Sequence, residues 1–277
     1  MEKILLAVDA LKPNRNALDF ASYLGRLTKS GITCIFPDHP ETTVPVHRDL
    51  HGFPIAFAEN KAAKNQIAIK ARIEETISGF KKQYGDSDTI FVVHRESGLP
   101  EEDLVLESRF ADMLILNAEM TFDNRLEGAP THFVINMLKK AECPVIIAPE
   151  SFEGIDEIIF CYDGAYDSIF AIKQFTYLFP QLQNKKLTVL QIDEDGKGKK
   201  HEETRFSEWL KSHYNNFQYE IINGKVKHML FDFLFKRKDI FIVMGAYGRT
   251  ALSTFFKKST AEPLIKTITQ PVFISHF

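Results

Sequence analysis

Two glycines followed by a Lys-Ser-Thr triplet are the residues of this chain whose types and spacing could bind a phosphate group. Gly245 and Gly248 follow an apolar run, and after nine intervening residues the triplet Lys258–Thr260 opens a helical pattern. A glycine adopts positive φ readily and lets backbone N–H groups approach a ligand. A helix N-terminus adds unpaired N–H donors and the positive end of a dipole, which together favour a phosphate. The two glycines alone would indicate an ordinary turn, and together with Ser259 at this spacing they predict a phosphate-binding loop.

Short apolar runs alternate with longer amphipathic stretches along the chain, which is typical of βαβ units with a parallel sheet. In the first half we expect strands at Ile4–Val8, Ile32–Phe36, Ile90–Val93, Met113–Leu116 and Val145–Ala148. In the second half we expect strands at Ile158–Tyr162, Leu187–Ile192, Phe217–Ile222, Ile240–Met244 and Val272–Ile274. The fold class predicted is α/β.

The two halves also resemble each other, which indicates an internal duplication. Lys3–Asp9 matches Glu157–Asp163 at an offset of 154, whereas Asp112–Leu116 matches Asp239–Val243 at an offset of 127. The difference of 27 residues predicts an insertion in the first half. We expect two domains, at residues 1–150 and 155–277.

The insertion is expected to follow the second strand, because Ile35 still matches Val189 at the larger offset. The Pro-rich segment 37–60 is the place for part of it. Its side chains Asp38, His39, His47, Asp49 and His51 are of types that bind zinc. No helix fixes their spacing, so we expect a solvated loop and no metal.

Composition excludes several classes of protein. A net charge of −3 argues against a nucleic-acid binder. No apolar run reaches the roughly 18 residues that a membrane span needs. Three scattered cysteines and the absence of an N-terminal signal indicate buried thiols and a cytoplasmic protein.

An Asp that ends the first strand, glycines after the fourth strand and a Pro that precedes the fifth occur together in the second half. With Gly98–Glu102 ahead of a fourth strand, this arrangement resembles the tandem universal stress proteins over nearly the whole chain. The resemblance implies two doubly wound, Rossmann-like five-stranded parallel sheets of order 3-2-1-4-5. It also implies that the fifth strands meet, so that one chain forms a pseudo-two-fold dimer of its own halves. Further association into a homodimer stays open.

The resemblance implies that ATP or a related adenine nucleotide binds the second half. Asp163, with its neighbours, would lie at the base or ribose end, and Ile192 would contact the adenine edge through its backbone. Ser259 and Thr260 would donate hydrogen bonds to the phosphates. The full expected set is Tyr162, Asp163, Gly164, Ile192, Met244, Gly245, Gly248, Arg249, Lys258, Ser259 and Thr260.

Lys258 departs from the family pattern, which has a glycine at this position. A non-glycine residue in left-handed geometry costs roughly 1–2 kcal/mol and brings a Cβ towards the ligand. A lysine at a helix start also supplies a charge that phosphates favour. Both interpretations stay open, as does the plain alternative that Asp163 and Gly164 form a strand-ending turn.

The first half lacks the loop glycines. At the offset of 127, Ala118 and Thr121 replace Gly245 and Gly248, and His132 replaces Ser259. We therefore expect no nucleotide in the first half.

Three functions follow from this reading. The first is a regulatory, non-enzymatic stress-response protein that binds an adenine nucleotide. The second is a nucleotide-free interaction module of the same fold. The third is an adenylating or ATP-pyrophosphatase enzyme, although the Ser-Gly-Gly-x-Asp-Ser loop of such enzymes is replaced here by Asp163–Ser168. No catalytic residues are expected.

Overall fold

The computed structural model describes residues 1–37, 56–84, 91–96, 99–122, 127–194, 200–245 and 269–275. In the first half the elements are β1 (Lys3–Ala7), α1 (Arg15–Thr28), β2 (Gly31–Pro37), α2 (Ala56–Tyr84), β3 (Phe91–Glu96), α3 (Pro100–Ser108), β4 (Met113–Leu116), α4 (His132–Lys140) and β5 (Val145–Ile147). In the second half they are β6 (Glu157–Cys161), α5 (Tyr166–Leu178), the short 3-10 helix η2 (Pro180–Leu182), β7 (Lys186–Asp193), α6 (Lys200–Lys211), β8 (Phe217–Asn223), α7 (Val226–Phe235), β9 (Ile240–Gly245) and β10 (Val272–Ser275).

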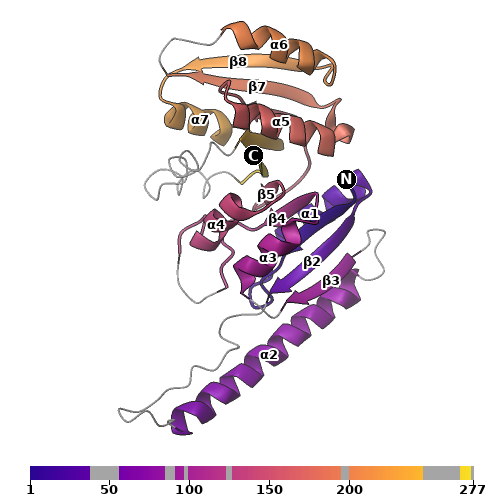
Figure 1. Ribbon diagram of the computed structural model, residues 1–277, viewed down its shortest axis with the longest axis vertical. Helices are drawn as coiled ribbons and strands as arrows, with labels where there is room; N and C mark the ends of the chain where they lie inside the picture. Colours follow the sequence, from indigo (N-terminus) through magenta and orange to yellow (C-terminus); the bar gives the residue numbers. More distant parts are fainter. Residues whose placement is uncertain are drawn as a thin grey trace.

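The described strands form one ten-stranded sheet of order β3-β2-β1-β4-β5-β10-β9-β6-β7-β8. Each half has the predicted order 3-2-1-4-5, and every pair within a half is parallel. The two halves meet where β10 pairs antiparallel with β5, with Phe273 opposite Ile146. The two sheets expected from the sequence are therefore joined edge to edge, and the fifth strands meet as predicted (Figure 1).

Strands in the middle of the sheet, such as β1, β4 and β9, are nearly continuous apolar runs because helices cover both faces there, whereas the edge strands β3 and β8 also carry polar residues. Helix α1 shows how the covering elements form. Ala17, Phe20, Ala21 and Leu24 recur at helical spacing and are all buried. The side chain of Asn14 accepts a hydrogen bond from the N–H of Ala17, which caps the first turn.

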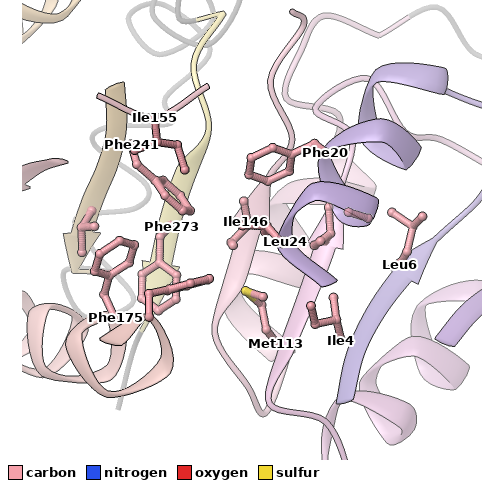
Figure 2. Packing of buried hydrophobic residues seen from close by; sticks show 14 of the residues in the cluster. Ile4, Leu6, Phe20, Leu24, Met113, Ile146, Ile155, Phe175, Phe241 and Phe273 are labelled. Carbon is pink, nitrogen blue, oxygen red and sulfur yellow. The ribbon is translucent and has the colours of Figure 1, made fainter. Parts of the chain in front are cut away.

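The sheet separates two hydrophobic layers. One layer lies under α1, α2, α5 and α6, and the other lies under α3, α4 and α7. The first layer runs across the junction of the halves, where the Phe20 ring lies 6.1 Å from the Phe241 ring and the Phe175 ring lies 5.4 Å from the Phe273 ring. Figure 2 shows Ile146 between the rings of Phe20 and Phe273. The halves thus share a core as well as a strand pair.

The structural alignment of β2 with β7, the second strands of the two halves, differs by one residue from the alignment expected from the sequence. Ala7 pairs with Ile35 in the first half, and Cys161, the equivalent of Ala7, pairs with Leu190. Ile35 therefore corresponds to Leu190, and the match of Ile35 with Val189 was wrong. A one-residue shift moves every side chain to the other face. Thr33 and Thr188 are equivalent in the structural register and are the signal in the sequence that the expected match missed.

The connection from β2 to β3 is longer than its counterpart. It spans 53 residues, against 23 from β7 to β8, and α2 has 29 residues where α6 has 12. The N-terminal part of α2 projects away from the rest of the molecule (Figure 1). Most of the predicted insertion at 37–60 lies outside the described residues, so its limits and the division at 150–155 stay predictions.

Candidate functional site

The direction of the chain reverses within the sheet between β6 and β9. From β6 the chain moves outward through β7 and β8, whereas β9 and β10 lie on the other side of β6. In such sheets ligands bind beyond the carboxyl ends of the strands at this switch point. Asp163 follows β6, Ile192 lies near the end of β7, and Gly245 ends β9. Three of the expected site residues therefore lie on neighbouring strands at one edge.

Asp163 and Gly164 form the tight turn from β6 into α5. Gly164 has a φ of 74°, a left-handed conformation that a glycine adopts without a steric penalty. The carboxylate oxygen Oδ1 of Asp163 accepts a hydrogen bond of 2.9 Å from the N–H of Ala165. The strand-ending turn that the sequence left open is thus present, with the carboxylate held at its centre.

Burial raises the pKa of the Asp163 carboxyl. Hydrogen bonds from Ser168 and from the N–H of Ala165 act against this shift, and the nearby charge of Asp167 adds to it. Ser168 is 1% exposed, and its hydroxyl also contacts the Ala165 carbonyl oxygen at 2.8 Å. A desolvated carboxylate in the crevice of an α/β sheet is typical of a functional site.

Gly245 is in direct contact with the start of α5. A Cβ placed on this residue would lie 2.5 Å from the carbonyl carbon of Asp167 and 2.5 Å from the backbone nitrogen of Ser168. Real Cβ atoms do not approach backbone this closely, so the position requires a glycine. Packing of β9 against α5 is a sufficient reason for this glycine, and it differs from the phosphate contact expected from the sequence.

The other expected residues of β6, β7 and β9 divide between the two faces of the sheet. Ile192 and Met244 are half-buried against the layer under α7. Tyr162 belongs to the opposite layer, is 4% exposed, and stacks on Phe206 with ring centroids 4.4 Å apart. The Tyr162 side chain is therefore part of the core, and its backbone is the part of the residue that lies at the strand end.

The remaining expected residues are Gly248, Arg249, Lys258, Ser259 and Thr260, which lie outside the described residues. The phosphate-binding loop and the two interpretations of Lys258 therefore stay predictions.

Sequence reasoning missed Ser168. It lies five residues after Asp163, in the first turn of α5, and it is buried. Its hydrogen bond to the Asp163 carboxylate acts to lower the pKa of that group. A signal was present in the spacing, because the helical turn after a strand-ending Asp returns the chain towards that carboxylate.

In the first half, Asp9 is the counterpart of Asp163. It is 4% exposed, and its Oδ1 accepts a 2.8 Å hydrogen bond from the N–H of Leu11. The Asp side chain accepts the same hydrogen bond at both strand ends, although the residue after it has a positive φ only in the second half, at Gly164. That hydrogen bond alone therefore does not distinguish a binding half from a silent one.

The three cysteine thiols all have raised pKa values. Burial raises the pKa of the Cys143 and Cys161 thiols to about 12, with Asp112 and Asp163 adding to the respective shifts, and burial raises the pKa of Cys34 as well. Thiols of this kind are poor nucleophiles. Cys34 and Cys143 are buried as expected, whereas Cys161 is only half-buried.

Within the described residues, no group of three His, Cys, Asp or Glu side chains is placed to hold a metal ion. The candidate ligands from Asp38 to His51 lie outside this part of the chain. No described helix is long and apolar enough to cross a membrane.

Comparison with known proteins identifies the fold. No protein-family model and no curated protein matches the sequence. Among solved structures, a universal stress protein from Archaeoglobus fulgidus DSM 4304 matches 99% of this chain and 96% of its own, with a TM-score of 0.61 and 18% identity. A putative universal stress protein from Pseudomonas aeruginosa UCBPP-PA14 matches 100% of this chain and 93% of its own, with a TM-score of 0.58 and 17% identity. The chain, with its two repeats of order 3-2-1-4-5, therefore has the fold of the universal stress proteins.

Proposed function

We propose that this protein is a cytoplasmic, regulatory stress-response protein that binds ATP or a related adenine nucleotide in its second half. The observation that carries the proposal is the desolvated Asp163 carboxylate at the switch point between β6 and β9. Universal stress protein folds of the same length match both halves of the chain. A ribose hydroxyl donating to Asp163 would supply a hydrogen bond to a carboxylate that is costly to bury.

The half-buried side chains of Ile192 and Met244 support a place for the base. They lie on one face of the sheet near the carboxyl ends of β7 and β9. Partly exposed apolar side chains of this kind suit the flat face of an adenine. Gly248, Arg249, Lys258, Ser259 and Thr260 are proposed to hold the phosphates.

The proposed binding is regulatory, with no dedicated catalysis. At the described part of the site, Asp163 and Ser168 are the polar side chains in contact, and the carboxylate has its hydrogen bonds from Ala165 and Ser168. This pair lacks the base-activated nucleophile that covalent catalysis requires.

A nucleotide-free interaction module of the same fold is the second candidate. The observations that favour it are the internal hydrogen bonds of Asp163 and the packing reason for Gly245. If the protein is an interaction module, Asp163 at the switch point only stabilises the turn after β6, as Asp9 does after β1.

The experiment that separates the two candidates begins with the purified protein. Heat-released ligand is identified by absorbance at the adenine band and by mass spectrometry, and nucleotide binding is measured by calorimetry. Asp163→Ala should weaken binding, and Gly248→Val should abolish it by filling the phosphate path. Asp9→Ala is the matched control in the first half and should leave the affinity unchanged.

Lys258→Gly separates the two interpretations of the lysine. If strain dominates, the glycine tightens binding, because the left-handed geometry then costs less. If the charge dominates, binding weakens by about 1–3 kcal/mol, the scale of a charged hydrogen bond. No binding by either the native protein or Lys258→Gly would favour the interaction module.

A further inference from the structure

The N-terminus of α4 already carries an anion from its own chain. The N–H of His132, the first residue of this nine-residue helix, donates a 2.7 Å hydrogen bond to the carboxylate oxygen Oε2 of Glu127. The N–H of Val134 donates to the hydroxyl of Thr131 at 3.3 Å. In the duplicated chain, His132 corresponds to Ser259, which is proposed to meet a phosphate. Glu127 thus places a carboxylate where the other half is proposed to receive a ligand.

The loop between β4 and α4 is also closed on itself. The N–H of Thr131 donates to the carbonyl oxygen of Ala118 at 3.2 Å, and the Thr131 hydroxyl donates to the carbonyl oxygen of Met120. The N–H of Met120 donates to the carbonyl oxygen of Asn117 at 3.1 Å. Thr131 is 2% exposed. These N–H and O–H donors all point to acceptors within the loop.

A cavity of about 450 Å³ lies beside this helix start and is lined by Glu127, His132 and Phe133, among others. Further along the same wall, Asn136 donates to Glu101 at 3.0 Å and Lys140 forms an ion pair with Glu101. Burial acts to raise the pKa of Glu101, but the hydrogen bonds from Lys140 and Asn136 outweigh it and lower that pKa. The side-chain cation and amide that α4 presents to the cavity are therefore already paired with a carboxylate.

We propose that Glu127 keeps the first half closed to anions by taking the place of an anionic ligand on the N-terminus of α4. A carboxylate and a phosphate oxygen both accept hydrogen bonds from helix N–H groups and both gain from the helix dipole. A free anion would have to displace Glu127 and would meet its negative charge at close range. The first half is then closed to anions for two reasons, the loss of its loop glycines and the presence of Glu127 at the start of α4.

This proposal involves residues of the first half alone, so it does not rest on nucleotide binding by the second half. The test uses Glu127→Gln in the full chain, with inorganic phosphate as the probe. Glutamine keeps the size of the side chain and one acceptor oxygen for the N–H of His132, but it lacks the charge, so phosphate can displace it. Glu102→Gln is the matched control, because Glu102 lines the same cavity whereas the N–H of His132 donates to Glu127.

The thermal midpoint is measured against phosphate concentration, with chloride at equal ionic strength as the reference. Glu127→Gln should show a saturable rise of about 2–4 °C beyond the native protein when phosphate exceeds its Kd about tenfold. The amide resonance of His132 should shift with the same saturation. Glu102→Gln should behave as the native protein does.

Equal midpoint shifts in all three proteins would overturn the proposal, since they would report only a general salt effect. A gain in Glu102→Gln as large as that in Glu127→Gln would overturn it too, because total charge and not the helix contact would then be the cause. Saturable binding of phosphate at His132 in the native protein would show that Glu127 does not close the site.

Discussion

Gly245 lies directly against the backbone of Asp167, so that a Cβ on the glycine would come within 2.5 Å of the Asp167 carbonyl carbon. This contact locks the carboxyl end of β9 to the first turn of α5. The same turn carries Ser168, which contacts Asp163 at the end of β6. The close approach therefore sets the geometry of the candidate site at the switch point.

Gly245→Ala should destabilise the protein by about 1–3 kcal/mol, the cost of inserting an atom into closely packed structure. Chemical denaturation measures the free energy of unfolding. Gly79→Ala in α2 is the control, because nothing lies within 4 Å of its added Cβ and alanine favours a helix. The control should stabilise by about 0.5–1 kcal/mol. Equal effects of the two substitutions would show that the contact with α5 is absent.

Asp163→Asn should stabilise the protein at neutral pH. The folded-state pKa of Asp163 is raised, so its ionisation opposes folding as the pH rises above the ordinary value of 3.8. Asparagine keeps the acceptor for the N–H of Ala165 without the buried charge. The difference in thermal midpoint between variant and native protein should shrink as the pH falls towards and below 3.8. A difference that grows on acidification would contradict the raised pKa.

The same substitution should weaken any nucleotide binding that depends on the carboxylate. A variant that is more stable yet binds less well is the expected signature of a charge kept for function. Unchanged affinity for the nucleotide in Asp163→Asn would indicate that the residue serves only the turn.

Glu157 is a buried carboxylate at the amino end of β6, with 8% of the residue exposed. It accepts a 2.5 Å hydrogen bond from the Thr188 hydroxyl and pairs with Arg237 at 3.2 Å. Glu157→Ala should lower the free energy of unfolding by about 1–3 kcal/mol, because the buried hydroxyl loses its acceptor. Asp156→Ala, which breaks the exposed pair with Lys185, should change it by less than about 1 kcal/mol. Similar losses in both variants would contradict this assignment.

Phe273 joins the halves through β10 and is fully buried. Its ring lies 5.4 Å from that of Phe175, and its backbone pairs with Ile146 of the first half. Phe273→Ala should cost about 3–5 kcal/mol of unfolding free energy, as a large cavity in a core does. Phe110→Ala should stay within about 0.5 kcal/mol, since Phe110 is 73% exposed. A small loss for Phe273→Ala would indicate that the shared core contributes little.

The sequence predicted the α/β class and nine of the ten strands to within one residue at each end, while β3 ends three residues later than expected. The resemblance to the tandem universal stress proteins predicted the meeting of the fifth strands. Buried parallel strands are uninterrupted apolar runs, and the duplication showed each run twice. The phase of the second strand was misread because Gln191 of β7 occupies the position of the core residue Phe36 of β2, which hides the match between the two strands. Thr33 and Thr188, which are equivalent in the pairings, carried the correct phase.

The candidate site was predicted only in outline. The strand-end positions of Asp163 and Gly245 follow from topology, since neighbouring parallel strands end at one edge. The contact of Ser168 has a signal in the helical spacing after Asp163, whereas the contact of Glu127 with His132 depends on how a loop closes in space, which spacing alone does not give. The reason for Gly245 likewise lies in α5, 78 residues earlier in the chain at Asp167.

Titration calorimetry with ATP on the full chain tests the central claim most directly. The account predicts one site per chain, with weaker binding in Asp163→Ala and unchanged binding in Asp9→Ala. Two equivalent sites would contradict the expectation that the first half binds no nucleotide. No binding by the native protein, together with no adenine nucleotide in its heat-released fraction, would contradict the proposed function itself.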